Sequence, residues 1–299
     1  MSDYSLKTMR QEFKDKGVFY TPPELAKMLK SYIPGTLSRV YDPTCGRGNL
    51  LSVFDDDVEK YGQDIDAEAI ADAEKRIPNF HGAVGDVLAN PKFIDMRFDA
   101  IVANPPFSVT WNETTDGIFA FAPAVPSKSK ADYAFLLHIL WMLSDDGIAV
   151  VLNFPGIAYR GGREKTIRQW MVEQNYIDQV VHIPGKTFVD TTIATLLIVL
   201  KKKRTTTDVH FVDQEHGIEK TVSIDAIRAA DYTLSPSTYI ERATEKVIVD
   251  PVALEASARA SAIKRIRLEI RMTKTIAEFE GWDYQSFIDD VRTAVDEEA

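Results

Sequence analysis

The sequence of 299 residues predicts an α/β protein with a Rossmann-like, doubly wound sheet of about seven mostly parallel strands. Three observations lead to this fold class. Short apolar runs alternate along the chain with segments of helical periodicity, a glycine-rich turn follows the first run, and three successive runs end in an acidic residue. The hydrophobic content of 45% is ordinary for a globular protein and allows a sizeable core.

The apolar runs define the strands of this sheet. The candidate strands are residues 39–42, 60–64, 82–85, 98–103, 147–154, 177–183 and 193–200. Helical patterns at 67–76, 131–143 and 164–175 separate most of them, which predicts a mostly parallel sheet with helices on both faces. The last two strands are joined by only about nine residues, too few for a helical crossover, so we expect that pair to be antiparallel.

Two segments fall outside this alternation. Residues 108–130 have little periodicity, and long irregular loops in compact domains are usually functional or mobile. We expect one domain over residues 1–207 and a small helical region over 208–299, in which a long helix covers 252–279. Between residues 259 and 274 this helix carries six basic residues and one acidic residue, which makes it a candidate for docking a partner.

Composition excludes several classes of protein. A single cysteine, Cys45, rules out an internal disulfide, and the N-terminus lacks the apolar core of a signal peptide. The longest apolar run, 193–200, is too short to span a membrane, so we expect a cytoplasmic protein. The net charge of -10 argues against a chain that covers nucleic acid by itself, because phosphate binding relies on Lys and Arg.

The stretch "VYDPTCGRGNLL", residues 40–51, contains a strand, an acidic residue, a glycine-rich turn and an expected helix start. Gly46 and Gly48 allow a tight turn and a close approach of the backbone to a ligand. A plain strand-to-helix turn would need the same two glycines. The residues that follow favour a binding site.

Three successive strands end in a carboxylate, at Asp42, Asp64 and Asp86. An isolated aspartate at a strand end is usually a turn or helix cap. In an open α/β sheet, however, these positions share the edge that binds ligands. There Asp64 is placed to take both hydroxyls of a ribose, and Asp86 to accept from an exocyclic amine, so the three together favour a nucleoside ligand.

Asp42 narrows the identity of that ligand. The turn lacks the third glycine of a dinucleotide fingerprint, and an anionic pyrophosphate would sit poorly beside a carboxylate. A ligand with an ammonium or sulfonium group suits Asp42 better. S-adenosylmethionine has both cations together with a ribose and an adenine, and no metal site is expected.

The stretch "NPPF" follows the strand 98–103 directly. Pro105 and Pro106 end the strand ladder and hold the backbone rigid, which is also their simplest structural role. The amide oxygen of Asn104 and the carbonyl of Pro105 form two acceptors that suit a planar NH2 group, and Phe107 can stack on the ring that carries it. Two such acceptors would favour a pyramidal nitrogen that attacks a methyl group. A base in a duplex must be flipped out to reach such a pocket.

These residues resemble the amino methyltransferases with an (Asn/Asp)-Pro-Pro-(Tyr/Phe) motif, in particular the modification subunits of type I restriction–modification systems. The similar stretches are "GVFYTPPELAKML" (17–29), "DPTCGRGNLL" (42–51), "NPPF" (104–107), "SKSKADYAFLLHILWML" (127–143) and "AYRGGREKTIRQWMVEQNYIDQVVHIPGKTF" (158–188). The resemblance runs from about residue 17 to residue 203, and more faintly through 229–240.

The resemblance implies an adenine-N6 DNA methyltransferase that uses S-adenosylmethionine. Thr21 would hold the methionine carboxylate, Asp42 would lie near the methionine amino group, and Asp64 and Asp86 would bind the ribose and the adenine amine. DNA is the implied substrate. Since nothing in the chain looks like a target recognition domain, a specificity-type subunit or a second copy of the chain is the expected partner.

The same resemblance assigns the target side of the site. Asn104 and Pro105 would bind the target amine, with Phe107 stacked on the base and Phe188 as a weaker candidate for a second ring. Asp132 and His138 lie on an otherwise apolar helix and are expected to be buried anchors.

Two other functions fit part of this pattern. A glutamine side-chain amide also offers an NH2 group to two acceptors, so methylation of glutamine N5 in a protein is an alternative. The opening "FYTP" and the second half of the chain argue against it. A non-catalytic subunit that organises a complex is the other alternative, and the intact "NPPF" counts against that.

Overall fold

The structure is a computed structural model that describes residues 21–115, 117–185, 194–241 and 250–298. The chain forms two compact units, Met1–Arg242 and Ala243–Ala299. The predicted α/β fold with a large, mostly parallel sheet is confirmed for the first unit, and the described sheet has nine strands rather than seven.

The nine strands include all seven predicted ones. They are β1 (Arg39–Asp42), β2 (Glu59–Asp64), β3 (Phe80–Val84), β4 (Phe98–Ala103), β5 (Leu143–Asn153), β6 (Ile177–Ile183), β7 (Thr195–Lys201), β8 (Val209–Asp213) and β9 (Ile218–Val222). Their order across the sheet is β3-β2-β1-β4-β5-β7-β6-β8-β9. The first five strands in the chain pair in parallel. β7 is antiparallel to β5 and to β6, which confirms the antiparallel pair predicted from the short link.

The two additional strands lie beyond residue 207. β8 pairs in parallel with β6, and β9 returns antiparallel to β8. Buried and partly exposed residues alternate along β8, as expected for a strand with one face in a core. The expected boundary at residue 207 therefore divides the sheet, and the first compact unit continues to Arg242.

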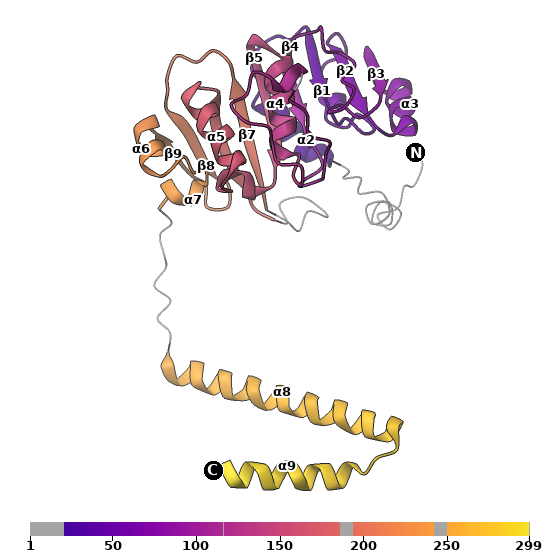
Figure 1. Cartoon of the computed structure of the whole chain (residues 1–299), viewed down its shortest axis with the longest axis vertical. Helices are drawn as coiled ribbons and strands as arrows, with labels where there is room; N and C mark the ends of the chain where they lie inside the picture. The colour runs from indigo at the N-terminus through magenta and orange to yellow at the C-terminus, as the bar shows by residue number, and fades with distance from the viewer. Residues whose placement is uncertain (1–20, 116, 186–193, 242–249, 299) are drawn as a thin grey trace. The chain divides into compact units, whose positions relative to one another are not determined.

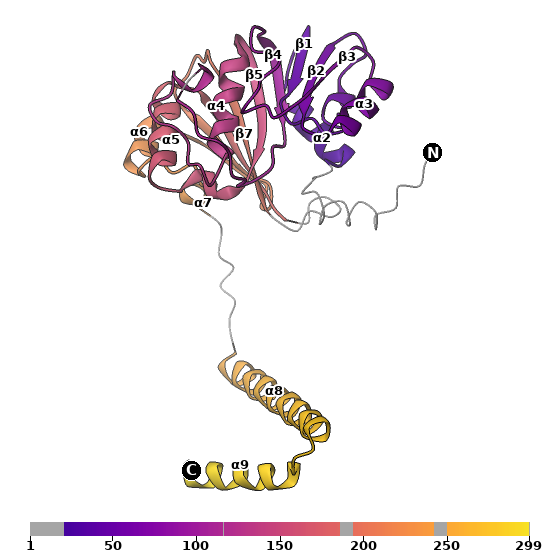
Figure 2. The ribbon, with the colours of Figure 1, turned by 45° about the vertical axis from the view of Figure 1, so that its right-hand side comes forward.

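Helices cover both faces of this sheet (Figure 1). The described helices of this unit are α2 (Pro23–Ser31), α3 (Ala67–Arg76), α4 (Asp132–Met142), α5 (Arg163–Glu173), α6 (Ile224–Ala229) and α7 (Pro236–Tyr239). Short 3-10 turns are η1 (Leu51–Val53), η2 (Gly117–Phe119) and η3 (Pro155–Ala158). Figures 1 and 2 both show α3 beside the β3 edge, and Figure 1 shows α6 beside β9.

Two hydrophobic cores lie on the two faces of the sheet. Alternate residues of β4 divide between them: Ala100 and Val102 join the core under α2, and Ile101 and Ala103 join the core under α4 and α5. α4 is apolar around its whole circumference and is buried along almost all of its length, so it lies inside the second core. The sheet is therefore packed on both faces, and the glycine turn and the NPPF motif lie at the carboxyl ends of its strands.

The irregular segment 108–130 has packing of its own. Trp111 and Phe119 are buried with ring centroids 5.0 Å apart, and the Trp111 indole donates to the Ser127 carbonyl at 3.0 Å. The segment therefore contributes to the core under α4, although η2 is the only helical turn that the structure describes in it.

The second unit contains α8 (Pro251–Glu280) and α9 (Tyr284–Glu298), which confirms the long helix predicted over 252–279. Asp250 caps α8 by accepting from the Val252 N–H at 2.9 Å, and Gly281 ends it in a left-handed conformation. Only Ala277 is buried on α8 among the described residues. Across the described part of the chain, no helix has the length and apolar character that a bilayer span needs.

Candidate functional site

The parallel strands β1, β2 and β3 bring the three predicted carboxylates to one edge of the sheet. Asp42 is the last residue of β1 and lies opposite Gly62, so Asp64 extends two residues further at the end of β2. Asp64 in turn lies opposite Val84 of β3, just before Asp86. The carboxyl ends of these strands therefore form the edge at which α/β sheets bind ligands.

The glycine turn lies across the end of β2. Gly46 and Gly48 both have positive φ angles, of 51° and 77°, which explains the need for glycine at each position. The Gly46 N–H donates to Asp64 Oδ2 at 2.7 Å. A Cβ atom at Gly48 would lie 2.4 Å from Ile77 Cδ1, so this glycine also permits close packing against the end of α3.

The expected helix start after this turn is wrong, because the chain forms only the 3-10 turn η1 there. Leu50, Leu51 and Phe54 are all buried in the core under α2. Two of these residues are adjacent, and Phe54 already has an extended backbone with ψ of 152°. A regular helix would have moved one of the adjacent leucines away from that core.

Asp64 is the half-buried acceptor that joins the first two strand ends. In addition to the Gly46 bond, its Oδ1 accepts from the Asp66 N–H at 3.0 Å. The side chain therefore orders the turn after β2 and the glycine turn at the same time. Its partial exposure keeps the carboxylate at the surface of the predicted cofactor site.

Asp42 lies beneath the glycine turn, with only 1% of its surface exposed. Burial raises the pKa of this carboxyl group to about 8, opposed by the hydrogen bond from the Thr44 N–H and assisted by the charge of Asp64. A cation bound above the turn would favour the ionised form of Asp42. Among the described residues, the buried Thr44 hydroxyl has no hydrogen-bond partner, so the same turn has an unsatisfied polar group.

Asp86 is exposed at the end of the third strand. Its Oδ1 accepts from the Leu88 N–H at 2.9 Å, and its backbone carbonyl accepts from the Asn90 N–H at 2.7 Å. The Asp86 carboxylate therefore stabilises the turn that follows β3, and it is more exposed to solvent than the Asp42 carboxylate.

Gln63 holds the turn after β3 in place, a role that was not predicted from the sequence. Its buried amide donates to the carbonyls of Gly85 at 3.1 Å and Asn90 at 3.0 Å, and its Oε1 accepts from the Lys92 N–H at 3.0 Å. The available signal was a long polar side chain inside a buried strand, where it must find partners.

Thr21 brings three of the predicted motifs together. The Asn104 side chain donates from Nδ2 to Thr21 Oγ1 at 3.2 Å, and Asn49 of the glycine turn donates to the Thr21 carbonyl at 3.1 Å. Because Nδ2 of Asn104 points to Thr21, its Oδ1 points in another direction and can serve as an acceptor. Thr21 itself is buried, and Asn104 is partly exposed.

The other residues of the NPPF motif differ in their exposure to solvent. Pro105 is buried, Pro106 is exposed and Phe107 is half-buried. Ser108, which follows them, has a positive φ of 53° and donates from its backbone to Asp132 Oδ1 at 3.1 Å. This bond anchors the turn to the start of α4.

Asp132 is part of a buried charged group under the motif. Its Oδ2 contacts Arg160 at 3.2 Å, and the same guanidinium contacts Glu164 at 3.1 Å. Burial raises the pKa of Glu164, with Arg160 opposing the shift. The expected role of Asp132 as a buried anchor is confirmed by these contacts.

His138 is also the buried anchor that the sequence predicts. It is fully buried inside the core, 3.3 Å from the Tyr41 hydroxyl, and burial lowers its pKa to about 3. The imidazole is therefore neutral and belongs to the core. Phe188, the weaker candidate for a second ring, lies outside the described residues.

An aromatic side chain that the sequence did not point to lies at the end of the neighbouring strand. Phe154 directly follows β5, which pairs with β4, and it is 36% exposed. The Arg160 guanidinium lies 5.9 Å from the centre of its ring. This ring is a further apolar surface near the end of β4.

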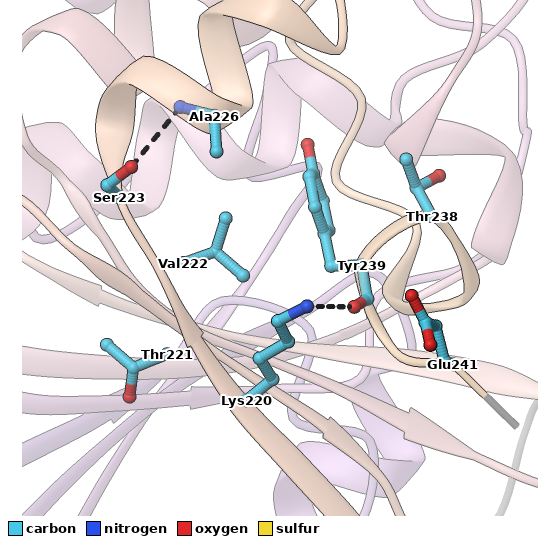
Figure 3. A pocket seen from close by; sticks show the side chains of 8 residues that line it. All are labelled: Lys220, Thr221, Val222, Ser223, Ala226, Thr238, Tyr239 and Glu241. Atoms are coloured by element: carbon cyan, nitrogen blue, oxygen red, sulfur yellow. Dashed lines mark hydrogen bonds between the residues drawn. The ribbon is translucent and has the colours of Figure 1, made fainter.

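A hollow of about 350 Å³ lies at the opposite end of the sheet, between β9, α6 and α7 (Figure 3). Figure 3 shows that Lys220 points to the Tyr239 carbonyl, at 2.9 Å, and that Ser223 accepts from the Ala226 N–H. These groups therefore serve the local fold. In the strand order, β9 is separated by four strands from β4, the nearest of the strands that the motifs follow, so this hollow is distinct from the candidate site.

Comparison with known proteins connects this edge with a family. Residues 2–222 match the family model described as N-6 DNA Methylase. The methylase subunit of the type I restriction enzyme MpnII from Mycoplasma pneumoniae is 30% identical over 307 aligned positions, which cover 82% of this chain and 56% of the relative. The chain thus spans little more than half the length of that protein.

Solved structures agree with this comparison. The methyltransferase subunit of a type I restriction–modification system from Streptococcus thermophilus has a TM-score of 0.68 and 28% identity, covering 75% of this chain and 59% of that one. A chain from a structural study of complex assembly and conformational transition in a type I system has a TM-score of 0.60. It covers 91% of this chain and 70% of its own length, but at 16% identity it shows the shared fold alone.

Proposed function

Because the chain belongs to the N-6 DNA Methylase family, we propose that it transfers a methyl group from S-adenosylmethionine to the N6 amine of adenine in DNA. The observation that carries this proposal is the hydrogen bond from Asn104 to Thr21. It joins the residue proposed to bind the target amine to the residue proposed to bind the methionine carboxylate. Donor and acceptor of the methyl group would then meet at one place on the sheet edge.

The target side of the site consists of the motif at the end of β4. Asn104 Oδ1 and the Pro105 carbonyl would accept the two hydrogens of an adenine amine. The lone pair of that amine is delocalised into the ring, so acceptors that favour a pyramidal nitrogen help most in the transition state. Phe107 would stack on the flipped base, since a base inside a duplex cannot reach this turn.

The residues present fit S-adenosylmethionine. Gly46 has open space where a Cβ would lie, and the Thr44 hydroxyl below it lacks a partner among the described residues. Asp42 supplies negative charge for the cationic end, and Asp64 supplies acceptors for the ribose hydroxyls. When bound, this cofactor supplies the electrophilic methyl group.

Asp86 and Thr21 would complete the cofactor site. Asp86 is exposed at the third strand end, where its second carboxylate oxygen can accept from the adenine amine of the cofactor. Thr21 would hold the methionine carboxylate through its hydroxyl. Both roles follow from the family resemblance, and both residues lie on the edge that the glycine turn occupies.

DNA and a specificity-type subunit, or a second copy of the chain, are the proposed partners. The net charge of -10 is unfavourable for DNA binding by this chain alone, whereas residues 259–274 of α8 carry six basic residues and one acidic residue. Apolar side chains of α8 such as Ile266, Leu268 and Met272 are more than half exposed. Such a surface favours docking of another chain, which would bring the basic residues near DNA.

The test compares Asn104→Ala with the wild type in cofactor binding and in methyl transfer to unmethylated DNA, with and without the partner subunit. We expect cofactor affinity within a few-fold of wild type, but a rate lower by on the order of a hundredfold or more. Asn112→Ala, which removes an exposed asparagine of the irregular segment, is the matched control and should retain full rate.

The product decides between the proposed function and the alternatives. Digested DNA should contain N6-methyladenine. Methylated glutamine in a protein substrate, with unmodified DNA, would replace the proposal by the protein methyltransferase. Near wild-type DNA methylation by Asn104→Ala would remove the role assigned to the motif, and absence of any transfer with every partner would favour a non-catalytic subunit.

A further inference from the structure

A separate group of side chains of the types that bind metal ions lies where β6 and β8 end. His182 is the penultimate residue of β6 and pairs directly with Asp213, the last residue of β8. Glu215 and His216 follow in the turn that leads to β9. The short stretch "DQEH" holds three of these residues, but only the pairing of two distant strands adds His182.

The distances within this group suit a single ion. His182 Nδ1 lies 3.4 Å from Asp213 Oδ1, and His216 Nδ1 lies 3.1 Å from Asp213 Oδ2. One ligand atom from each of His182, Asp213 and Glu215 lies within 4.8 Å of the others. Ligands about 2.1 Å from a tetrahedral ion are separated by roughly 3.4 Å. The 3.4 Å between His182 Nδ1 and Asp213 Oδ1 matches this spacing, and a closer approach of Glu215 would complete the set.

The backbone around these ligands is already ordered. The Gln214 N–H donates to the His182 carbonyl at 3.1 Å, and the Glu215 N–H donates to Asp213 Oδ1 at 3.0 Å. The Gln214 side chain contacts the Tyr32 hydroxyl at 3.5 Å, just beyond the end of α2. The turn is therefore held on both sides, and a bound ion would need little reorganisation of the backbone.

Asp213 is the buried carboxylate at the centre of this group, and it already accepts from the Glu215 N–H. Its carboxylate is only 1% exposed, and buried carboxylates are usually paired, hydrogen-bonded or bound to a metal. The imidazoles of His182 and His216 approach its two oxygens, one at each. The carboxylate of Glu215 lies in the same group. By contrast, His210 on the same strand contacts the single exposed carboxylate of Glu219 at 3.3 Å, as in an ordinary surface pair.

We propose that His182, Asp213 and Glu215 bind one divalent transition-metal ion, and that His216 orients Asp213 through its second oxygen. One imidazole and two carboxylates suit Zn²⁺ or Mn²⁺, whereas Mg²⁺ prefers oxygen ligands alone. The ion would hold the ends of β6 and β8 together with the turn that follows. This role is structural, and it stands independently of the proposed methyl transfer.

The test measures Zn²⁺ binding to the tag-free full chain by titration calorimetry, and the metal content after dialysis. We expect one Zn²⁺ per chain and a higher melting temperature with Zn²⁺ than with chelator. Glu215→Gln and His182→Gln should each abolish this binding. His216→Gln should weaken it by about ten- to a hundredfold, because it removes only the outer partner of a ligand.

His210→Gln is the matched control, since it changes a histidine of the same strand that lies outside the proposed ligand set. Its Zn²⁺ affinity should equal that of the wild type. The exposed position of Glu215 makes Glu215→Gln tolerable for folding, which circular dichroism would verify. No Zn²⁺ binding by the wild type, equal binding by Glu215→Gln and His182→Gln, or equal affinity for Mg²⁺ would each overturn the proposal.

Discussion

At the scale of single residues, Thr21 shows how side chains from distant motifs combine. Its hydroxyl accepts from Asn104 and its carbonyl accepts from Asn49, so the segment before α2 is joined to the glycine turn and to the proline motif. The amide of Asn104 therefore has a defined orientation before any substrate binds. Such preorganisation is what the transition-state role proposed for Asn104 requires.

Asp42 leads to a prediction about pH. Its pKa is raised to about 8 by burial, so the carboxyl group is mainly protonated at pH 7 in the free protein. A cationic cofactor favours the ionised form, so binding should release a proton. Affinity should rise with pH between about 6 and 7.5, below the range in which a free α-amino group loses its proton. The rise can approach roughly tenfold per pH unit.

Calorimetry in two buffers of different ionisation enthalpy measures this proton release. Asp42→Asn cannot ionise and should bind more weakly, without the release and with a flatter pH dependence. If wild type and Asp42→Asn release the same number of protons on binding, another group responds to the cofactor.

At the scale of elements, the glycine turn depends on the helix that it packs against. A Cβ added at Gly48 would meet Ile77 and Ala73 at the end of α3, and Gly48 has a positive φ. An added Cβ at Gly46 would face open space, so this glycine is needed for its positive φ and not for close packing. The two glycines look alike in sequence but serve different purposes.

Gly48→Ala should therefore destabilise the fold more than a substitution that only strains the backbone. The new Cβ would meet Ile77 Cδ1 at 2.4 Å, which requires a shift of packed atoms. Overpacking costs typically about 1–3 kcal/mol, in addition to the cost of the left-handed conformation. Urea unfolding of the variant measures the change in the free energy of unfolding.

Gly217→Ala is the matched control for this prediction. Gly217 has a φ of 63° and nothing within 4 Å of its added Cβ, so only backbone strain is introduced. Equal loss of stability in the two variants would show that the contact with α3 is unimportant.

At the scale of the whole molecule, the chain divides into units of different character. Unit Met1–Arg242 has two cores and all the predicted site residues. In Ala243–Ala299, by contrast, Phe279 is 91% exposed, and Ala277 is the only buried residue of α8 that the structure describes. A pair of helices that buries so little apolar surface gains little stability by itself.

Deleting residues 243–299 should leave cofactor binding unchanged, because the residues proposed to bind it belong to the first unit. Assembly with the partner and the DNA binding that depends on it should be lost. Calorimetry with S-adenosylmethionine and size-exclusion chromatography with the partner measure the two effects. A truncated protein that unfolds or no longer binds the cofactor would place the helices in the core instead.

The sequence by itself determined the alternation of strands and helices and the antiparallel β7, and it supplied the residues that we propose for the site. Hydrophobic periodicity, a short link and turn residues are local signals, and each can be read without knowing the fold. It also indicated the sheet edge at which Asp42, Asp64 and Asn104 lie, since the carboxyl ends of parallel strands share one edge.

Tertiary structure alone decided how these residues are used. It placed Asp42 beneath the glycine turn and Asp86 in solvent, although the sequence suggests the same position for both, at the carboxyl end of a strand. It replaced the expected helix by η1, added β8 and β9 to the sheet, and brought His182 to Asp213. Burial, the pKa shift that follows from it and contacts between distant strands depend on packing of the whole sheet, which no local pattern contains.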